Sequence, residues 1–299
     1  LACMPESAAF AEGKLNRPLL TIDRVNIEVY AKKHQLKWVE DDSNQDLQFD
    51  RNYLRQRVVP RIKERWPAQT KVLSRVANIQ ADNALLLRQL AALDMQQGVG
   101  KSRETLSITS LKRLPLERQR NLIRFWIEEN GFVAPGYTKL EHIISDVLYC
   151  KPDRTPVVIW GKQEVRRSGD HLVVMATLAK HNAAQQYQWD YRKPLLLESL
   201  SCQLQAQPTK SDGIVLPDNT KCLSVCFRSG GERIQPQAAG RQRTLKNLMQ
   251  EAGIASWQRD RIPLVYLNDE LIAVVGYWVS SHYVCPAGQS GLLFELTDC

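Results

Sequence analysis

The sequence predicts a protein of the α+β class with more than one domain. Its 299 residues exceed the roughly 100–200 residues of one typical domain, which favours two or three domains. In the first half of the chain, apolar residues recur every three or four positions, as in amphipathic helices. In the segments 155–177 and 263–279, short apolar runs separated by turn residues are typical of antiparallel strands.

The first 66 residues are predicted to be mainly helical. Residues 18–39 have a strand-like start followed by an amphipathic helix. The segment 41–50 is rich in Asp, Ser and Asn, which bond to their own backbone and favour turns. Asp50 is suited to be the N-cap of a helix that runs to Val59. Pro60 should then kink or end that helix, because proline lacks a backbone N–H.

Apolar spacing predicts a buried face on the helix that begins near Asp50 and on the helix that follows it. On the first, the residues spaced by four that should face a core are Leu54, Val58 and Ile62. The clearest helix of the chain covers residues 68–97. Its apolar stripe consists of Val72, Val76, Ile79, Leu86, Leu90 and Leu93.

The remaining sequence predicts a helical domain with a small antiparallel sheet, a linker and a small α+β domain. The first, residues 67–177, also contains a strand at 105–109, helices at 115–130 and 138–149, and the three strands TPVVIWG, QEVRRSG and HLVVMAT. Residues 178–210 are polar, without a strong period, and are expected to be a linker with weak strands. Residues 211–299 contain a helix, TLKNLMQEAG, and a hairpin around Asn268-Asp269.

Basic residues gather in three segments of this chain, whose net charge is +8. Residues 51–75 hold eight basic residues and one acidic residue, residues 101–124 hold seven and two, and residues 228–261 hold seven and three. Arginine forks suit phosphate groups, and the aromatic residues between them could stack on RNA bases. The alternative is that each basic run is a solvated helix face and each aromatic residue belongs to a core. Three basic segments together favour RNA binding.

The segment FRSGGERI, residues 227–234, suggests an anion-binding loop. Consecutive glycines expose backbone N–H groups that can surround a phosphate. However, the segment lacks the GxxxxGK[ST] pattern, and no helix follows it at once. With Arg228 and Arg233 beside it, a contact with an RNA backbone is plausible; the alternative is a glycine turn in a small sheet.

Other classes of site find little support in the sequence. No GxSxG, HExxH or Rossmann pattern occurs. The acidic residues between positions 40 and 50 could bind a metal, but their order suits a turn and a helix cap better. Seven scattered cysteines without a close CxxC pair favour reduced thiols in a cytoplasmic protein. The sequence contains no run of 18 apolar residues and no signal-peptide pattern, so we predict neither a membrane span nor a secreted protein.

Two long motifs resemble one known family. The stretch EDDSNQDLQFDRNYLRQRVVP, residues 40–60, is similar to the D-x-S-N and R-N-x-x-R pattern of the tRNA(Ile)-lysidine synthetases. The matching residues are Asp41 or Asp42, Ser43, Asn44, Arg51, Asn52 and Arg55. The stretch FRSGGERIQPQAAGRQRTLKNLMQEAGIASWQRDRIPLVY, residues 227–266, resembles the C-terminal module of the same family. The resemblance covers the whole chain and is weakest around residues 178–215.

The resemblance implies a ligase that acts on tRNA. Enzymes of this family use ATP to activate C2 of the wobble cytidine in the CAU anticodon of tRNA(Ile); the lysine amine then attacks C2, and AMP leaves. ATP and Mg²⁺ are thus implied, together with L-lysine and tRNA(Ile). The family's SGGxDS loop for ATP is not found in this sequence, and its place would lie upstream of Leu1. We therefore expect the chain to be a fragment that carries the tRNA-recognition portion.

The resemblance also assigns domains and residues. Residues 1–66 would be the end of an α/β nucleotide-binding catalytic domain, residues 67–177 the tRNA-specificity domain, and residues 211–299 a tRNA-binding domain. Arg51 would be catalytic, and Asn52 and Arg55 would bind substrate. The residues expected to bind RNA are Arg228, Arg233, Arg241, Arg243, Lys246, Arg259 and Arg261.

Two other functions and the oligomeric state stay open. The chain could be a non-catalytic RNA-binding module, which predicts tRNA binding without ATP consumption. It could also be a scaffold for other proteins, which predicts no salt-dependent affinity for RNA. The sequence leaves the oligomeric state undecided, a homodimer included.

Overall fold

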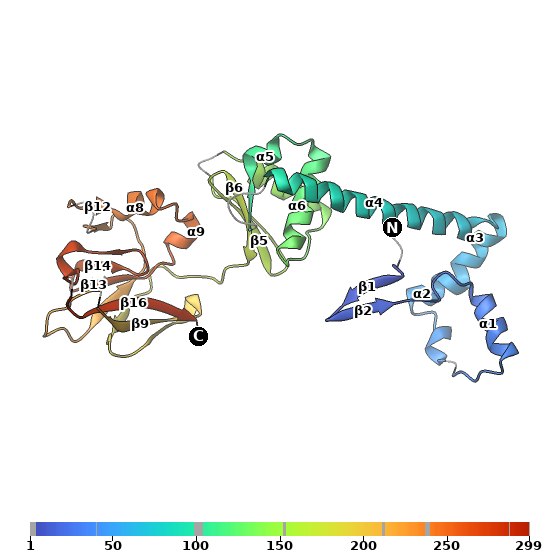
Figure 1. Cartoon of the computed structure of the whole chain (residues 1–299), viewed down its shortest axis with the longest axis horizontal. Coiled ribbons are helices and arrows are strands. Elements are labelled where there is room, and N and C mark those ends of the chain that lie inside the picture. Colours follow the sequence, from blue (N-terminus) through green and yellow to red (C-terminus); the bar gives the residue numbers. More distant parts are fainter. Residues whose placement is uncertain are drawn as a thin grey trace. The chain divides into compact units, whose positions relative to one another are not determined.

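The computed structural model describes residues 4–39, 41–98, 104–151, 154–210, 213–236, 240–286 and 288–298. Contacts between residues divide the chain into two compact units, Leu1–Gln97 and Gly98–Cys299. Figure 1 labels many of the elements of both units along the chain, and each unit is described by itself. No helix among the described residues is long and apolar enough to cross a membrane.

The first unit opens with a hairpin and is otherwise helical (Figure 1). Its elements are β1 (Ser7–Phe10), β2 (Gly13–Asn16), α1 (Arg24–Lys33), the 3-10 turn η1 (Asp42–Gln45), α2 (Asp50–Tyr53), the π-helical turn η2 (Leu54–Val58), α3 (Val59–Arg65) and α4 (Gln69–Gly98). The two strands pair antiparallel, with Phe10 opposite Gly13. The strands therefore precede residue 18, where the sequence had suggested a strand-like start.

The helical run from Asp50 to Arg65 differs from the prediction at both ends. Phe49, not Asp50, is the N-cap, and Asp50 is the first helical residue, where its charge complements the helix dipole. Pro60 does not end the run, because it lies in the first turn of α3, where its missing N–H is tolerated. The wider turn η2 directly precedes α3.

The apolar stripes predicted on the first unit's helices lie largely on its surface. Leu54, expected to face a core, is 51% exposed, whereas Ile62 is half-buried. Helix α4 forms as predicted, but five of its six stripe residues are exposed: Val72, Val76, Ile79, Leu86 and Leu93. Spacing predicts that a helix has an apolar face, but it does not say what covers that face. Within the described part of this unit, no element buries the stripe.

The first part of the second unit combines three helices with a four-stranded antiparallel sheet. Its elements are β3 (Thr105–Ser107), α5 (Ile108–Lys112), α6 (Leu116–Glu129), α7 (Tyr137–His142), the π-helical turn η3 (Ile143–Leu148), β4 (Val157–Trp160), β5 (Gln163–Ser168) and β6 (His171–Ala176). The strand order is β3-β6-β5-β4. Helix α6 buries Leu122, Ile123, Trp126 and Ile127, so the predicted helix and sheet strands of this region are confirmed.

The second part of this unit contains two larger sheets and two short helices. Its elements are β7 (Tyr187–Trp189), β8 (Leu195–Leu197), the turn η4 (Glu198–Leu200), β9 (Cys202–Thr209), β10 (Leu223–Cys226), β11 (Arg233–Ile234), β12 (Arg243–Thr244), α8 (Leu245–Glu251), α9 (Ser256–Arg259), β13 (Leu264–Leu267), β14 (Glu270–Val274), β15 (Trp278–Val279), the turn η5 (Ser281–Tyr283) and β16 (Gly291–Asp298). The sheet orders are β15-β14-β13-β10-β7 and β16-β9-β8, with β11 and β12 as a separate pair.

The strands expected within the segment 178–210 form, but the segment is not the linker that the sequence predicted. Strand β7 pairs with β10, and β9 pairs with β16 over eight residues, from Cys202 opposite Asp298 to Thr209 opposite Gly291. Trp189, Leu197 and Leu204 from this segment belong to the same buried cluster as Val225 and Phe294. The strands are therefore part of the C-terminal core. Their polar sequence hid this, because each strand presents one face to solvent.

The predicted hairpin and helix of the C-terminal part are confirmed. Strands β13 and β14 pair around Asn268, which adopts a left-handed conformation with φ 56°, as a tight turn requires. Helix α8 buries Leu245, Leu248 and Met249 in a second cluster of this part. Gly253 follows that helix with φ 69°, a conformation that glycine adopts readily.

Candidate functional site

The acidic segment between residues 41 and 50 forms a compact turn. The carboxylate of Asp41 accepts a hydrogen bond from the backbone N–H of Ser43 at 2.9 Å, and that of Asp46 accepts one from Gln48 at 2.9 Å. Hydrogen bonds from Ser43 lower the pKa of Asp41, and the charge of Arg51 lowers it further. Both carboxylates thus cap backbone groups of the turn. The side chain of Asp42 lies outside the described part of the chain.

Asn52 fastens this turn to helix α2. Its side chain is 1% exposed, and its amide donates to the carbonyl oxygens of Ser43 and Asp46, each at 2.8 Å. Gln56, one helical turn later, donates to the carbonyl of Asn44 at 2.9 Å. This burial revises the expectation that Asn52 contacts substrate, because the residue has almost no free surface. Its position makes it a residue that orients the turn.

Arg51 and Arg55 lie on the exposed surface of the same helical run. The Arg51 guanidinium lies 5.8 Å from the centre of the Phe49 ring. It forms no ion pair with Asp46 or Asp50, the two partners that a purely structural role would favour; this holds for the part of the chain that the structure describes. Arg51 is therefore available to an anionic ligand, and the turn held by Asn52 sets the position of its backbone.

The carboxylates of the acidic turn were considered as metal ligands because five acidic residues lie between positions 40 and 50. Among them, no three His, Cys, Asp or Glu side chains gather so that they could hold a metal ion. The carboxylates of Asp41 and Asp46 instead accept backbone N–H groups. Within the described part of the turn, these carboxylates therefore serve the backbone, and we derive no step through a Mg²⁺ ion.

The glycine loop at residues 227–234 is occupied by its own glutamate. The Glu232 carboxylate accepts the backbone N–H of Ser229 at 2.5 Å and that of Gly230 at 2.6 Å. Arg228 lies beside it, with its Nη1 3.3 Å from Asp260 Oδ1 and its Nε 3.9 Å from Glu232 Oε2. The amides that a phosphate would need are already used, so this loop is a glycine turn closed by an internal anion.

A short sequence pattern predicts that Glu232 closes this loop, and the prediction of a phosphate-binding loop did not take it into account. Ser229 and Glu232 are spaced as S-x-x-E, the pattern in which a glutamate reaches back to the N–H of the first residue. The reach-back contact forms here without a helix following it, because Gly230 and Gly231 both adopt positive φ. The loop therefore presents Arg228 in a fixed, half-buried setting.

We expect Glu232→Gln to reduce the stability of the C-terminal part at neutral pH and to flatten its response to acid. Burial alone would raise the pKa of Glu232, but the N–H groups of Gly230 and Ser229 and the charge of Arg228 lower it overall. A carboxylate with a lowered folded pKa adds stability above its unfolded pKa, here 4.5, and loses it as the pH falls through the folded value.

The measurement is the thermal unfolding temperature of variant and wild type between about pH 3 and pH 7. The difference between the two proteins should shrink as the pH falls. Asp269→Asn changes an exposed acid in the turn of the neighbouring hairpin and should leave the profile of the wild type unchanged. Parallel pH profiles for Glu232→Gln and wild type would contradict this account of the loop.

The seven basic residues predicted to bind RNA fall into two groups. Four are engaged within the protein: Arg228 with Asp260, Arg243 with Glu251, Arg259 with the carbonyl of Ile254, and Arg261 with the carbonyl of Ala179. Arg233, Arg241 and Lys246 are exposed and, among the described residues, make no hydrogen bond or ion pair through their side chains.

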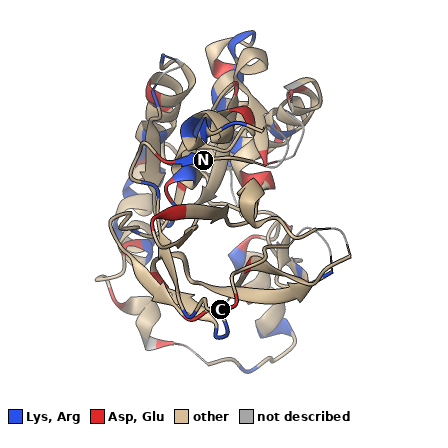
Figure 2. Cartoon of the chain, turned by 90° about the vertical axis from the view of Figure 1, so that its left-hand side faces the viewer, with Lys and Arg blue, Asp and Glu red and all other residues tan. Residues whose placement is uncertain are grey.

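The three unengaged residues come from one small supersecondary unit. Strands β11 and β12 pair with Arg233 opposite Thr244, and the backbone N–H of Leu245 donates to Glu232. Arg241 precedes β12, and Lys246 is the second residue of α8. In Figure 2, Lys and Arg positions recur in several separate segments of the ribbon, with Asp and Glu positions between them. Among the described residues, Arg233, Arg241 and Lys246 differ from the other four basic candidates because their side chains are not paired.

A second aromatic and basic group lies in the first part of the second unit. The ammonium of Lys112 lies 5.0 Å from the centre of the Tyr149 ring, and Gln119 donates to the Tyr149 hydroxyl at 3.0 Å. Tyr149 lies 30 or more residues from both partners, so no local pattern in the sequence marks it. Trp126, one of the aromatic residues near the basic segments that could have stacked on a base, is fully buried and belongs to the core.

Comparison with known proteins matches most of the chain. Residues 223–296 match the family model described as TilS substrate C-terminal domain, and residues 106–173 match TilS substrate binding domain. Residues 1–62 match the PP-loop domain model. These matches cover both the acidic turn and the glycine loop.

Curated relatives extend the match to nearly the full sequence. A tRNA(Ile)-lysidine synthase of Coxiella burnetii is 44% identical over 296 residues, which are 99% of this chain and 66% of the relative. Proteins of the same name from Legionella pneumophila (strain Paris) and Methylococcus capsulatus are 37% and 36% identical. They are matched over 94% and 95% of this chain. The chain spans 64–66% of the length of these three relatives.

Proposed function

Because this chain belongs to the tRNA(Ile)-lysidine synthase family, we propose that it carries the tRNA-recognition portion of such an enzyme. The whole protein would ligate L-lysine to C2 of the wobble cytidine in the CAU anticodon of tRNA(Ile), with ATP as the activating substrate. The observation that carries this proposal is the 44% identity with a named relative over 99% of the chain. The exposed, unpaired basic residues of the β11–β12 hairpin and of α2 support the tRNA-binding part.

Three residues of the helical run from Asp50 to Arg65 have distinct roles in this proposal. Arg51 would hold an anionic group of the reaction, either the activated nucleotide or the carboxylate of lysine. Asn52 would keep the acidic turn and Arg51 in a fixed relation, and Arg55 would contact substrate from the same helical run. ATP would supply the activating group: transfer of its adenylyl group to the C2 oxygen would release pyrophosphate, and attack of the lysine amine on C2 would then release AMP. Among the described residues, no three His, Cys, Asp or Glu side chains gather around a possible metal position, and no step here is routed through the Mg²⁺ that the family implies.

Neutralising Arg233 and Arg241 together is expected to weaken tRNA binding and to reduce its salt dependence. Each phosphate contact that is lost reduces the slope of log K against log[salt] by about 0.7 to 0.9, so the double variant should lower the slope by roughly 1.5. The measurement is the filter-binding affinity for tRNA(Ile) at several salt concentrations. The matched control is Lys210→Ala with Lys221→Ala, two exposed lysines of the same unit.

The control pair should leave the salt slope unchanged, because we place no phosphate contact there. Equal slopes for Arg233→Ala/Arg241→Ala and wild type would show that the hairpin is only a solvated basic surface. A slope reduced equally by both pairs would show that binding depends on net charge and not on this hairpin.

The proposed activity is tested on the whole protein with labelled lysine, ATP, Mg²⁺ and tRNA(Ile) bearing a CAU anticodon. We expect label in the tRNA and one AMP released for each lysine incorporated. ATP consumption without label in the tRNA would overturn the proposed reaction. A cytoplasmic location and a homodimer remain predictions, which fractionation and sedimentation can check.

A further inference from the structure

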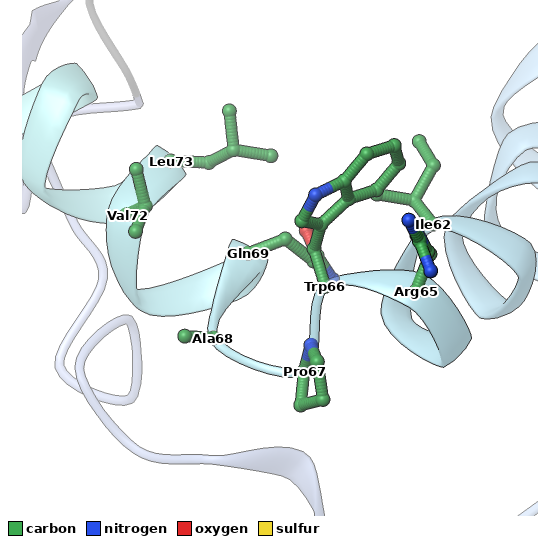
Figure 3. A pocket seen from close by; sticks show the side chains of 8 residues that line it. All are labelled: Ile62, Arg65, Trp66, Pro67, Ala68, Gln69, Val72 and Leu73. Atoms are coloured by element: carbon green, nitrogen blue, oxygen red, sulfur yellow. The ribbon is translucent and has the colours of Figure 1, made fainter.

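An open apolar pocket lies where α3 gives way to α4. It has a volume of about 550 Å³ and is lined by Ile62, Arg65, Trp66, Pro67, Ala68, Gln69, Val72 and Leu73. Figure 3 shows the indole of Trp66 standing between Ile62 and Arg65 of α3 on one side and Leu73 of α4 on the other. This volume falls within the roughly 300–1,000 Å³ of small-molecule sites. All the lining residues belong to the first unit.

The backbone fixes the indole at this corner. The N–H of Trp66 donates to the carbonyl of Ile62 at 2.8 Å, and the N–H of Gln69 donates to the carbonyl of Trp66 at 3.0 Å. The amide of Gln69 is turned to the hydroxyl of Thr70 at 2.8 Å. Trp66 is therefore held at both of its backbone groups while its side chain is 62% exposed. Among the described residues, its indole N–H makes no hydrogen bond.

The charge of the segment that carries the pocket indicates what could enter it, and Arg65 of this segment lines the pocket itself. Between positions 61 and 75 there are five basic residues and one acidic residue: Arg61, Lys63, Arg65, Lys71 and Arg75, with Glu64. All six are exposed. A protein partner that fills an apolar pocket gains nothing from a surrounding sequence segment of net charge +4 unless the partner is acidic. A nucleic acid needs both features, because its bases present apolar faces and its backbone is anionic.

We propose that the Trp66 pocket binds an unstacked base of single-stranded RNA, with the surrounding arginines and lysines contacting the phosphates on either side. The indole offers a flat face for stacking, and its free N–H can donate to a base edge. The inference deepens the proposed function, on which it rests, by naming the recognised feature: a base of a tRNA loop, not of a duplex stem.

The experiment compares Trp66→Ala, Trp66→Phe and Trp38→Ala in the complete chain. The probes are a hairpin RNA with a single-stranded seven-nucleotide loop and a duplex RNA of the same length. Trp38 is the matched control, because it is another tryptophan of the first unit and is 55% exposed. We expect Trp66→Ala to bind the hairpin on the order of tenfold more weakly, with an unchanged salt slope.

Three further results are expected. Trp66→Phe should recover most of the affinity, Trp38→Ala should bind like wild type, and duplex binding should change in none of the variants. The difference in fluorescence between wild type and Trp66→Phe reports on the Trp66 indole. The hairpin RNA should quench this difference. Wild-type affinity of Trp66→Ala for the hairpin would overturn the proposal. So would a changed sedimentation of the free Trp66→Ala chain with RNA binding intact, since the pocket would then hold a second copy.

These outcomes separate the pocket from the proposed reaction. If the whole protein fails to incorporate lysine while Trp66→Ala still loses hairpin affinity, the reaction is wrong and the pocket stands. If lysine is incorporated and Trp66→Ala binds the hairpin like wild type, only the pocket is wrong.

Discussion

Replacing Arg51 by alanine in the whole protein is expected to lower kcat/KM for lysine transfer by about 100-fold or more, with the folded structure unchanged. Removing one group that stabilises charge developing in a reaction commonly costs 10²–10³ in rate. Arg51 is exposed and pairs with neither Asp46 nor Asp50, so its removal leaves no buried partner without a counter-charge. The measurement is the initial rate of labelled lysine incorporation into tRNA at several lysine concentrations.

The way in which the loss divides between KM and kcat distinguishes two roles of Arg51. A rise in KM for lysine alone would favour a contact with the lysine carboxylate, whereas a fall in kcat would favour a contact with the activated nucleotide. Lys33→Ala, which removes an exposed charge at the end of α1, should retain wild-type kinetics. An unchanged rate in Arg51→Ala would remove this residue from the reaction.

Replacing Asn52 by alanine is expected to loosen the acidic turn. The position of Arg51, which follows this turn, should then be less well fixed. The substitution removes the hydrogen bonds to the carbonyls of Ser43 and Asp46, and each such bond contributes about 0.5–1.5 kcal/mol. Amide exchange at Asn44 and Asp46, whose N–H groups close the turn, should therefore accelerate by roughly tenfold or more. Hydrogen exchange of the complete chain measures this directly.

Gln56→Ala is the matched control for Asn52→Ala. It removes a single hydrogen bond, to the carbonyl of Asn44, from an exposed side chain, so its effect on exchange should be several-fold smaller. In the whole protein, Asn52→Ala should also slow lysine transfer, because Arg51 follows the turn directly. Normal exchange at Asn44 with a slowed reaction would instead indicate that Asn52 contacts substrate.

Local signals in the sequence were sufficient for most helices and for the hairpins of residues 155–177 and 263–279. The spacing of Leu122, Ile123 and Trp126 predicts the buried face of α6, and Asn268 predicts the turn between β13 and β14. These features depend on residues within a few positions of one another. The sequence is acidic up to Asp50 and basic after it. Interactions between neighbouring residues account for this change: acidic side chains cap the turn, and an exposed basic helical run follows.

Features that depend on distant partners could not be predicted in this way. The strand Cys202–Thr209 has a polar sequence, and its pairing with Gly291–Asp298 lies about ninety positions away. Ion pairing is equally hidden: Arg228 and Arg233 look alike in the sequence, but only Arg228 meets Asp260 in the fold. The seven candidate RNA-binding residues can therefore be reduced to Arg233, Arg241 and Lys246 only when the fold shows which charges are already paired.

The most direct test of the central claim is the retention of tRNA(Ile) bearing a CAU anticodon on a filter by this chain, with ATP, Mg²⁺ and labelled lysine present. We predict salt-dependent retention that exceeds that of an unrelated RNA of equal length, without label in the tRNA. That result would identify these residues as the portion of a lysidine synthase that binds tRNA. Retention no greater than that of the unrelated RNA would contradict the account.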